Sequence, residues 1–367
     1  MTIQKALLKI HLYVGLAATL FLVLIALTGC VLTFETELEG VFWPLRVQAQ
    51  PQAQPLPLQT LVDKVQQARP GKRALRIMLP QQAGEAHRVL VSDATWVYVN
   101  GYTGDVLGAR NLQSSFMRSV HNLHTGLLLK NRQLGSKLVG WVTVLLLLLA
   151  VSGLILWWPR KLLTLKRGVN WRRTNFDLHN ISGFYAFIFV LIMALTGVMM
   201  SFPDTAYKVV DGFTGEPPKF TPPRFTPQKG VPMISLEQEF QTAVNALPGA
   251  LPTSVGVMPP NSVDFKFPED KTFLGRSHVF LDPYSGQVQE VVNTRTAHPG
   301  LKARNLTRPL HTGDIWGWPT RALWFLASLL VVVQAVTGVL IWWKPKRKKA
   351  VSEVEPTPQP ESLGETA

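Results

Sequence analysis

Four of the eight histidines in this 367-residue chain occur in matched sequence motifs, and imidazole is the commonest metal ligand among protein side chains. His11 and His179 each open a long apolar stretch, with a glycine four residues later and an Ala-Leu-Thr-Gly motif at the same spacing. His124 and His311 are each followed by Thr-Gly and, further on, by Val-Ser-Gly or Val-Thr-Gly and two tryptophans. Because ionisable residues in or beside a membrane are functional candidates by default, we select these four histidines as candidate site residues.

The matched histidines favour a ligand that two imidazoles can hold. Zinc usually requires a third protein ligand, and no cysteine, aspartate or glutamate recurs at matching positions beside these histidines. Haem iron is satisfied by two axial imidazoles. We therefore expect two haem b groups, with His11 and His179 as axial ligands of one iron and His124 and His311 as those of the other. A straight helix from His11 to Phe34 spans roughly 35 Å at about 1.5 Å per residue, so one haem cannot serve both membrane faces.

Simpler interpretations of the same histidines stay open. Histidines at the edge of an apolar run are also compatible with helix anchors in the headgroup region. The glycine after His11, Gly15, leaves room either for a macrocycle or for close helix packing. His121, three residues before His124, is a secondary candidate, because arginine replaces it in the repeat. The remaining histidines, which we expect to be exposed or hydrogen-bonded, are His87, His278 and His298.

Four apolar stretches are long enough to cross a bilayer, which takes about 20 residues. Lys and Arg concentrate before the first stretch, between the second and third, and after the fourth. The positive-inside rule therefore places both termini in the cytoplasm, and the net charge of +14 needs no nucleic-acid partner. The predicted segments are transmembrane helices at 1–34, 138–158, 179–202 and 322–343, outer domains at 35–137 and 203–321, and cytoplasmic segments at 159–178 and 344–367, the last with a disordered tail.

The two outer segments carry the same order of patterns. Each begins with a predicted helix, Leu58–Ala68 or Ser235–Ala246, followed by alternating strand patterns with glycine at the turns. We predict an α-helical membrane protein with four transmembrane helices and two internally repeated units, each with a small α+β domain outside. The only cysteine, Cys30, allows no intrachain disulfide, and the apolar run continues past it, which argues against a lipoprotein cleavage site.

The motifs resemble those of the PepSY-associated transmembrane family over about residues 5–349. The pieces that carry the resemblance are Leu123-His-Thr-Gly, Leu138-Val-Gly, Leu156-Trp-Trp-Pro, Asp177-Leu-His, Ala194-Leu-Thr-Gly and Leu310-His-Thr-Gly-Asp-Ile-Trp-Gly, together with two PepSY-like hairpin turns. The family includes inner-membrane ferric-siderophore reductases of Gram-negative bacteria. The resemblance implies a multi-pass protein of the bacterial inner membrane, with PepSY-like periplasmic domains, that bears haem and passes electrons outward to ferric siderophores.

The chain also limits where electrons enter and leave. No Gly-x-Gly-x-x-Gly follows a predicted strand, so we expect electrons from a quinol or a protein partner. A large polar chelate cannot enter hydrocarbon, so we expect reduction in the periplasm, beside the haem of His124 and His311. We nominate no acid–base residue. The alternative, from another functional class, is a non-redox protein whose outer domains bind a siderophore, peptide or partner and assist transport.

Overall fold

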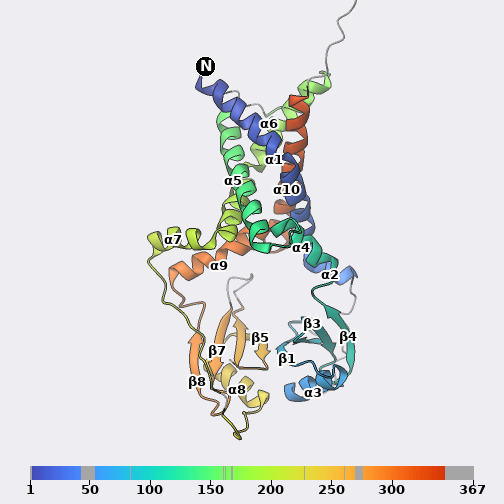
Figure 1. Ribbon diagram of the computed structural model, residues 1–367, viewed down its shortest axis with the longest axis vertical. Coiled ribbons are helices and arrows are strands. Elements are labelled where there is room, and N and C mark those ends of the chain that lie inside the picture. The colour runs from blue at the N-terminus through green and yellow to red at the C-terminus, as the bar shows by residue number, and fades with distance from the viewer. Residues whose placement is uncertain are drawn as a thin grey trace, which may run out of the picture.

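The computed structural model describes residues 2–42, 54–82, 84–159, 161, 163–166, 168–226, 228–259, 261–268 and 276–343. Four long helices form a bundle at one end, and a β-sheet with two covering helices forms the other end, with short helices between them (Figure 1). The predicted cytoplasmic tail, residues 344–367, lies outside the described residues.

The four long helices confirm the prediction of four membrane-spanning segments. Each is long and apolar enough to cross a bilayer, with a mean hydropathy of 2.2 to 2.6 over its most apolar window. Two of them begin at an asparagine cap, where the side chains of Asn131 and Asn170 accept hydrogen bonds from backbone N–H groups of the first turn. The helices are α1 (Ile3–Thr33), α5 (Arg132–Trp157), α6 (Trp171–Ser201) and α10 (Trp318–Trp342).

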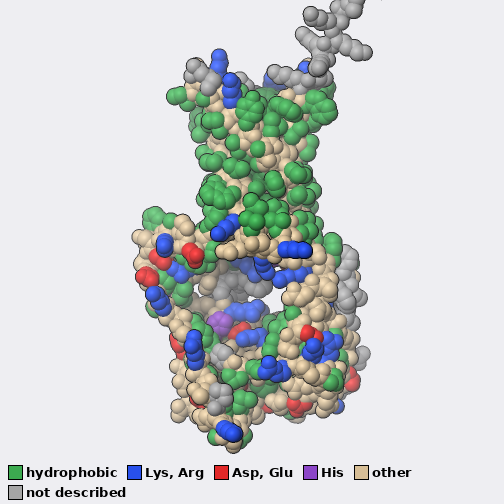
Figure 2. Space-filling view, in the orientation of Figure 1, with side chains coloured by type: hydrophobic (Ala, Val, Ile, Leu, Met, Phe, Trp, Pro, Cys, Tyr) green, Lys and Arg blue, Asp and Glu red, His purple; other side chains and the backbone are tan. Residues whose placement is uncertain are grey.

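Small side chains at the bundle centre let the four helices approach one another closely. Ala18, Ala26 and Ala186 are buried there together with larger aliphatic side chains such as Leu22 and Val331. Many large apolar side chains point outward instead, and they form a green belt around the bundle in Figure 2. Within a bilayer this arrangement is stable, because lipid tails solvate apolar side chains while small residues promote helix contact.

Four short helices lie at the sheet end of the bundle (Figure 1). After two of these short helices, α4 and α9, the chain turns back toward the bundle through residues in the left-handed conformation. Leu127 and Leu128 after α4 have φ of 53° and 56°, and Gly313 after α9 has φ of 75°. A Cβ at Gly135 would collide with the Gly126 carbonyl, so glycine is required where α5 returns beside α4. These helices are α2 (Glu35–Phe42), α4 (Phe116–Gly126), α7 (Pro203–Thr214) and α9 (Pro299–Thr312).

Eight antiparallel strands form one continuous sheet in the order β4-β3-β2-β1-β5-β6-β7-β8. The two outer segments, expected as separate small domains, are joined edge to edge because β1 pairs with β5, with Ile77 opposite Val255. The strands are β1 (Ala74–Met78), β2 (His87–Val91), β3 (Thr95–Val99), β4 (Val106–Asn111), β5 (Leu251–Gly256), β6 (Ser262–Lys266), β7 (Ser277–Leu281) and β8 (Val288–Val292). Pairing also covers an edge of each half, which would otherwise expose backbone N–H and C=O groups.

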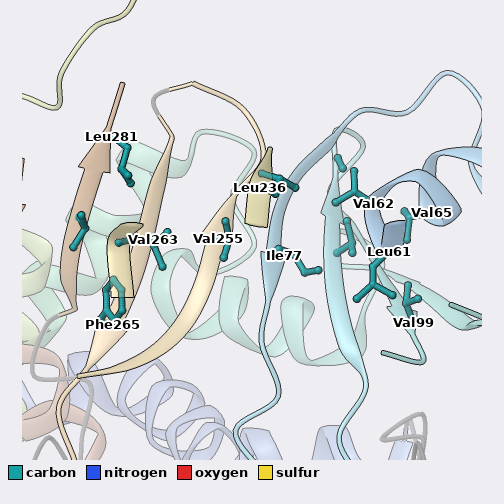
Figure 3. Packing of buried hydrophobic residues seen from close by; sticks show 14 of the residues in the cluster. Leu61, Val62, Val65, Ile77, Val99, Leu236, Val255, Val263, Phe265 and Leu281 are labelled. Carbon is teal, nitrogen blue, oxygen red and sulfur yellow. The ribbon is translucent and has the colours of Figure 1, made fainter. Parts of the chain in front are cut away.

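One face of the sheet is covered by α3 (Leu58–Ala68) and α8 (Leu236–Ala246), which form where the two helical patterns predicted helices. Alternate strand residues such as Ile77, Val263 and Phe265 pack under these helices in one core that crosses the β1–β5 junction (Figure 3). The helix α8 begins at a capping box in which Ser235 and Gln238 bond each other's backbone N–H groups.

The elements follow one another in the same order in the two halves of the chain. A long helix, a short helix, a covering helix, four strands, a short helix and a second long helix occur first from α1 to α5 and then from α6 to α10. This shared order of elements agrees with the predicted internal repetition, which stays a prediction.

Candidate functional site

The structure brings His11 and His179 together at the end of the bundle that lies far from the sheet. We call these two residues the far pair. Their ring centroids are 6.4 Å apart and the ring planes are perpendicular. His11 Nδ1 lies 2.8 Å from Ser152 Oγ, and His179 Nδ1 lies 2.8 Å from Thr337 Oγ1. The far pair therefore uses all four long helices: α1 and α6 supply the rings, and α5 and α10 supply their polar partners.

His124 and His311 meet at the end of the bundle nearest the sheet, and we call them the sheet-side pair. Their ring centroids are 6.2 Å apart. The rings come from the short helices α4 and α9 and reach into the bundle. His124 Nδ1 contacts the Thr28 hydroxyl and the Ile25 carbonyl of α1, both at 3.0 Å.

His311 of the sheet-side pair makes the equivalent contacts on α6. Its Nδ1 lies 3.1 Å from Thr196 Oγ1 and 3.0 Å from the Met193 carbonyl oxygen. Thr28 and Thr196 are the threonines of the two Ala-Leu-Thr-Gly motifs. The repeated motif therefore marks the residues that hold the sheet-side rings.

The hydrogen bonds define which ring nitrogen carries the proton. A carbonyl only accepts, so Nδ1 of His124 and of His311 must donate. Ser152 and Thr337 already donate their single hydroxyl proton to backbone carbonyls, at 2.6 Å in both cases, so they accept from Nδ1 of the far pair. In a neutral imidazole this leaves Nε2 as a lone-pair donor. All four rings are thus fixed in the tautomer that binds a metal through Nε2.

A helical glycine faces Cε1 of each ring. A Cβ added at Gly153 would lie 3.3 Å from His11, and one at Gly338 would lie 3.6 Å from His179. The corresponding distances are 3.4 Å from Gly29 to His124 and 3.2 Å from Gly197 to His311. Each Ser-Gly or Thr-Gly dipeptide therefore has two tasks: the hydroxyl holds Nδ1, and the next residue leaves room for the ring.

The glycines that follow the far-pair histidines by four residues have a different environment. A Cβ at Gly15 would meet Leu149 of α5 at 3.7 Å, and one at Gly183 would meet Gln334 of α10 at 3.2 Å. These contacts favour close helix packing, the second of the two interpretations of Gly15, over space reserved for a macrocycle.

The two pairs are stacked along the bundle axis. On α1, the residues that hold His124 follow His11 by 14 and 17 positions, and on α6 the residues that hold His311 follow His179 by the same intervals. At about 1.5 Å per residue, the pairs are separated by roughly 21 to 26 Å.

The residues of each pair fit a haem better than a zinc ion. Within the part of the chain that the structure describes, no group of three His, Cys, Asp or Glu side chains is placed to hold a metal ion. Two imidazole nitrogens that bind one metal ion from opposite sides, at about 2.0–2.1 Å each, lie about 4 Å apart, and the ring centroids then lie about 6 Å apart. The observed centroid separations of 6.4 and 6.2 Å meet this requirement. Two axial imidazoles suffice for haem iron.

His121 does not join either pair. Its Nδ1 is buried without a hydrogen-bond partner among the described residues. Burial is the largest cause that lowers the pKa of His121, and the nearby Arg118, Arg132 and Arg308 lower it further. His121 therefore contributes a polar group beside the sheet-side pair, in a positively charged setting.

The other three histidines serve the sheet and α9. His278 Nδ1 lies 2.9 Å from Asp264, and His298 Nδ1 accepts a hydrogen bond from the Gly300 N–H, so both are hydrogen-bonded as expected. His87 differs from the expectation, because its ring packs against the Gly101 turn, its Nδ1 is buried, and burial lowers its pKa to about 4.

Sequence reasoning missed an ionic cluster on the open face of the sheet. Arg76 of β1 crosses the junction to Asp264 of β6 at 2.5 Å and also donates to Ser254 at 2.8 Å. His278 and Arg276 approach the same carboxylate. Burial raises the pKa of Asp264, but His278, Arg76 and Ser254 lower it by more, to about 2. The sequence signal that could have predicted this position is the alternation of charged Arg76 with apolar Ile77, because neighbouring residues of a strand point to opposite faces of the sheet.

Comparison with protein families gives one clear assignment. The model of the PepSY-associated TM region matches residues 8–344, which is most of the chain. No curated protein sequence matches the chain at a significant level. This match covers both histidine pairs, all four membrane helices and the sheet, and the chain therefore belongs to the family of the PepSY-associated TM region.

Proposed function

We propose that this membrane protein is a two-haem electron conduit of the bacterial inner membrane that reduces ferric siderophore in the periplasm and so supports iron release and uptake. The observation that carries the proposal is the presence of two partly buried histidine pairs, each with both rings held at Nδ1 and with centroid separations of 6.4 and 6.2 Å. Haem held there would supply one-electron chemistry.

The far pair and the sheet-side pair have distinct roles in this proposal. Ser152 and Thr337 orient the far-pair rings, and Thr28 and Thr196 orient the sheet-side rings. Each hydroxyl keeps Nε2 free and makes its imidazole a stronger ligand. The bundle core excludes water between the pairs and holds them roughly 21 to 26 Å apart, which spans most of a hydrocarbon layer of about 30 Å.

The orientation of the chain follows from its charges. Lys5 and Lys9 stand near the start of α1, at the far end, so the proposal places that end and both termini in the cytoplasm. Electrons then enter from a quinol or a protein partner near the far pair. The sheet is periplasmic, and the two halves of the chain are proposed copies of one unit.

The space between the bundle and the sheet suits a substrate site. Figure 2 shows the molecule hollowed between the sheet end of the bundle and the sheet, with Lys and Arg side chains around the hollow. The sheet-side pair lies at the bundle end nearest this hollow. A polar ferric chelate there can approach the sheet-side pair without entering hydrocarbon.

The deciding experiment uses vesicles of both orientations. The full chain is reconstituted with haem, the haem is reduced with dithionite, excess reductant is removed, and a membrane-impermeant ferric siderophore is added. We expect haem oxidation when the sheet faces the added chelate and none when it faces the lumen. Oxidation only from the opposite face would contradict the proposed direction. Persistent reduced haem in both orientations would remove siderophore as the substrate, and a colourless protein would favour a non-redox binding function.

A further inference from the structure

The short helix α7 carries an exposed stripe of apolar side chains. Val209 is 58% exposed and Phe213 is 88% exposed. The spacing of three, one and three residues places the members of the stripe on one face of the helix. Single exposed apolar residues are common on proteins, but a stripe along a whole helix indicates a surface that a partner covers. The stripe consists of Ala206, Val209, Val210 and Phe213.

The other side of α7 packs on α9. Arg304 of α9 forms an ion pair with Asp211, and its guanidinium lies 4.5 Å from the centre of the Tyr207 ring. Val209 lies two residues from each of these α7 residues, and Phe213 lies two residues beyond Asp211. Two residues correspond to about 200° around a helix, so Val209 and Phe213 point away from α9.

The helix α7 starts at the edge of the membrane bundle. The membrane-spanning helix α6 ends at Ser201, and α7 starts at Pro203 after a single linking residue, Phe202. The Phe202 ring lies 5.7 Å from the ring of Trp141 on α5, which is 62% exposed. Exposed tryptophans at the end of a membrane bundle are typical of the boundary between acyl chains and headgroups. The start of α7 therefore lies at the depth of this boundary.

The direction of α7 turns its stripe toward the membrane. In Figure 1, α7 runs sideways from the bundle, and α9 lies on its sheet side. The stripe, which points away from α9, therefore faces the side of the bundle. Figure 2 shows apolar side chains on that side of α7 and charged side chains on the side of the sheet. The stripe thus continues the apolar belt of the bundle at its sheet-side edge.

We propose that α7 is an interfacial helix that buries its apolar stripe among the phospholipids of the sheet-side leaflet and thereby holds α9. The bilayer is the fitting partner because the stripe continues the surface that contacts acyl chains. A helix that lies along a membrane with one apolar face binds at the boundary of headgroups and acyl chains. Because α9 carries His311, the lipid contact also supports one ring of the sheet-side pair.

The short helix at the same position in the first half, α2, is held differently. Glu37 of α2 forms an ion pair with Arg321 of α10, and Glu39 forms one with Arg110 of β4. Charge therefore ties α2 to the bundle and to the sheet, whereas α7 is tied to α9 and presents its apolar stripe to lipid.

The first measurement locates α7 relative to lipid. The full chain carries Cys30→Ala, so that one added cysteine takes an environment-sensitive dye, and it is placed in nanodiscs with one copy per disc. The dye is attached at Val209→Cys, at Phe213→Cys or at the control Lys208→Cys, an exposed polar position on the same helix. At the two stripe positions we expect blue-shifted emission, quenching by lipids spin-labelled near the headgroup end of the acyl chain, and little quenching by aqueous iodide. The control should show the reverse.

Two results of this measurement would overturn the lipid contact. One is equal access of iodide to Phe213→Cys and Lys208→Cys. The other is protection of Phe213→Cys only in discs that hold two copies, because a second copy of this chain would then be the partner.

The second measurement tests whether α7 holds α9. Val209→Asp/Phe213→Asp puts two carboxylates into the stripe and is compared with Lys208→Asp, and backbone hydrogen exchange in nanodiscs is followed by mass spectrometry. We expect faster exchange in α7 and α9 of the double variant, with α4 unchanged, because a charged stripe leaves the lipid. Exchange of α9 equal to that in Lys208→Asp would overturn its support by α7. Neither measurement requires haem, so a protein without haem would reject the proposed function and leave this inference intact.

Discussion

The two histidine pairs share ring spacing and tautomer but differ in how the chain supports them. The far pair projects directly from two membrane-spanning helices, and each Nδ1 has one hydroxyl partner. The sheet-side pair projects from short helices, and each Nδ1 has both a hydroxyl and a backbone carbonyl. Rings that reach the bundle from α4 and α9 thus have a second hydrogen bond to fix them, whereas rings on long helices are already positioned by helix packing.

The largest expected effect comes from filling the space beside one ring. A side chain at Gly197 would press on both His311 and Thr143, each 3.2 Å from the added Cβ. We expect Gly197→Val to displace the His311 ring and to lower the haem content from two to about one per chain. The pyridine haemochrome assay measures this ratio. Gly212→Val is the control, because nothing lies within 4 Å of a Cβ there.

If Gly197→Val retains both haems with unchanged spectra, the space opposite His311 is not required for ligation. This result would refute the role of the glycine only at the sheet-side pair, because the rings of the far pair face Gly153 and Gly338 instead.

The ion pair near the far pair gives the next largest effect. Arg173→Ala leaves the fully buried Asp177 without its 2.9 Å partner, so we expect a loss of about 2 kcal/mol of stability, reduced from larger values because Arg173 is partly exposed. The melting temperature of the purified protein should fall. Adding Asp177→Asn should restore much of it, and a double variant no more stable than Arg173→Ala would refute the charge explanation.

Hydroxyl removal distinguishes the two pairs most sharply. Ser152→Ala deprives His11 of its hydroxyl acceptor, whereas Thr28→Val leaves His124 the Ile25 carbonyl at 3.0 Å. Loss of such a supporting contact typically lowers metal affinity about tenfold or more. We expect a clear increase in the rate of haem loss from the far pair in Ser152→Ala and a smaller increase from the sheet-side pair in Thr28→Val. Equal rates would show that the second acceptor has no effect.

The last comparison concerns the two halves of the sheet. The position of Leu61 in α3 corresponds to Glu239 in α8; both are fully buried, and burial raises the pKa of Glu239 to about 7. The folded state therefore binds this proton more tightly than the unfolded state, so the contribution of Glu239 to stability is greatest at acidic pH. It falls by about 1 kcal/mol per pH unit as pH rises from near 5 to 7.

The test for Glu239 is the melting temperature of the full chain across this pH interval. Glu239→Gln should flatten the dependence of the melting temperature on pH. The glutamine keeps a side-chain oxygen that can accept the hydrogen bond from Asn261. An unchanged slope in the variant would assign the pH dependence to other groups.

The sequence predicted the four membrane helices because apolar length is a local property of each segment. Matched motifs also predicted that His11 meets His179 and that His124 meets His311, and the structure brings both pairs together. Haem ligation and internal repetition stay predictions. The role of Ser152 was not predicted, although its motif was noticed, because a hydroxyl next to glycine is also common in ordinary helix packing.

The continuous sheet could not be predicted from local patterns. β1 and β5 pair across 178 residues, as in the contact between Ile77 and Val255, and strand-edge pairing has no short sequence signature. The burial of His87 was missed for a related reason: it depends on the Gly101 turn folding over the ring. Long-range contacts decided both features.

The most direct test of the central claim is the number of haems per chain in three proteins. The wild type, His11→Ala/His179→Ala and His124→Ala/His311→Ala are purified after expression with added haem, and the iron-porphyrin content is measured by pyridine haemochrome and by metal analysis. The two-pair account predicts about two haems in the wild type and about one in each double variant, with a different midpoint potential remaining in each. Equal haem content in all three proteins, or none in the wild type, would contradict it.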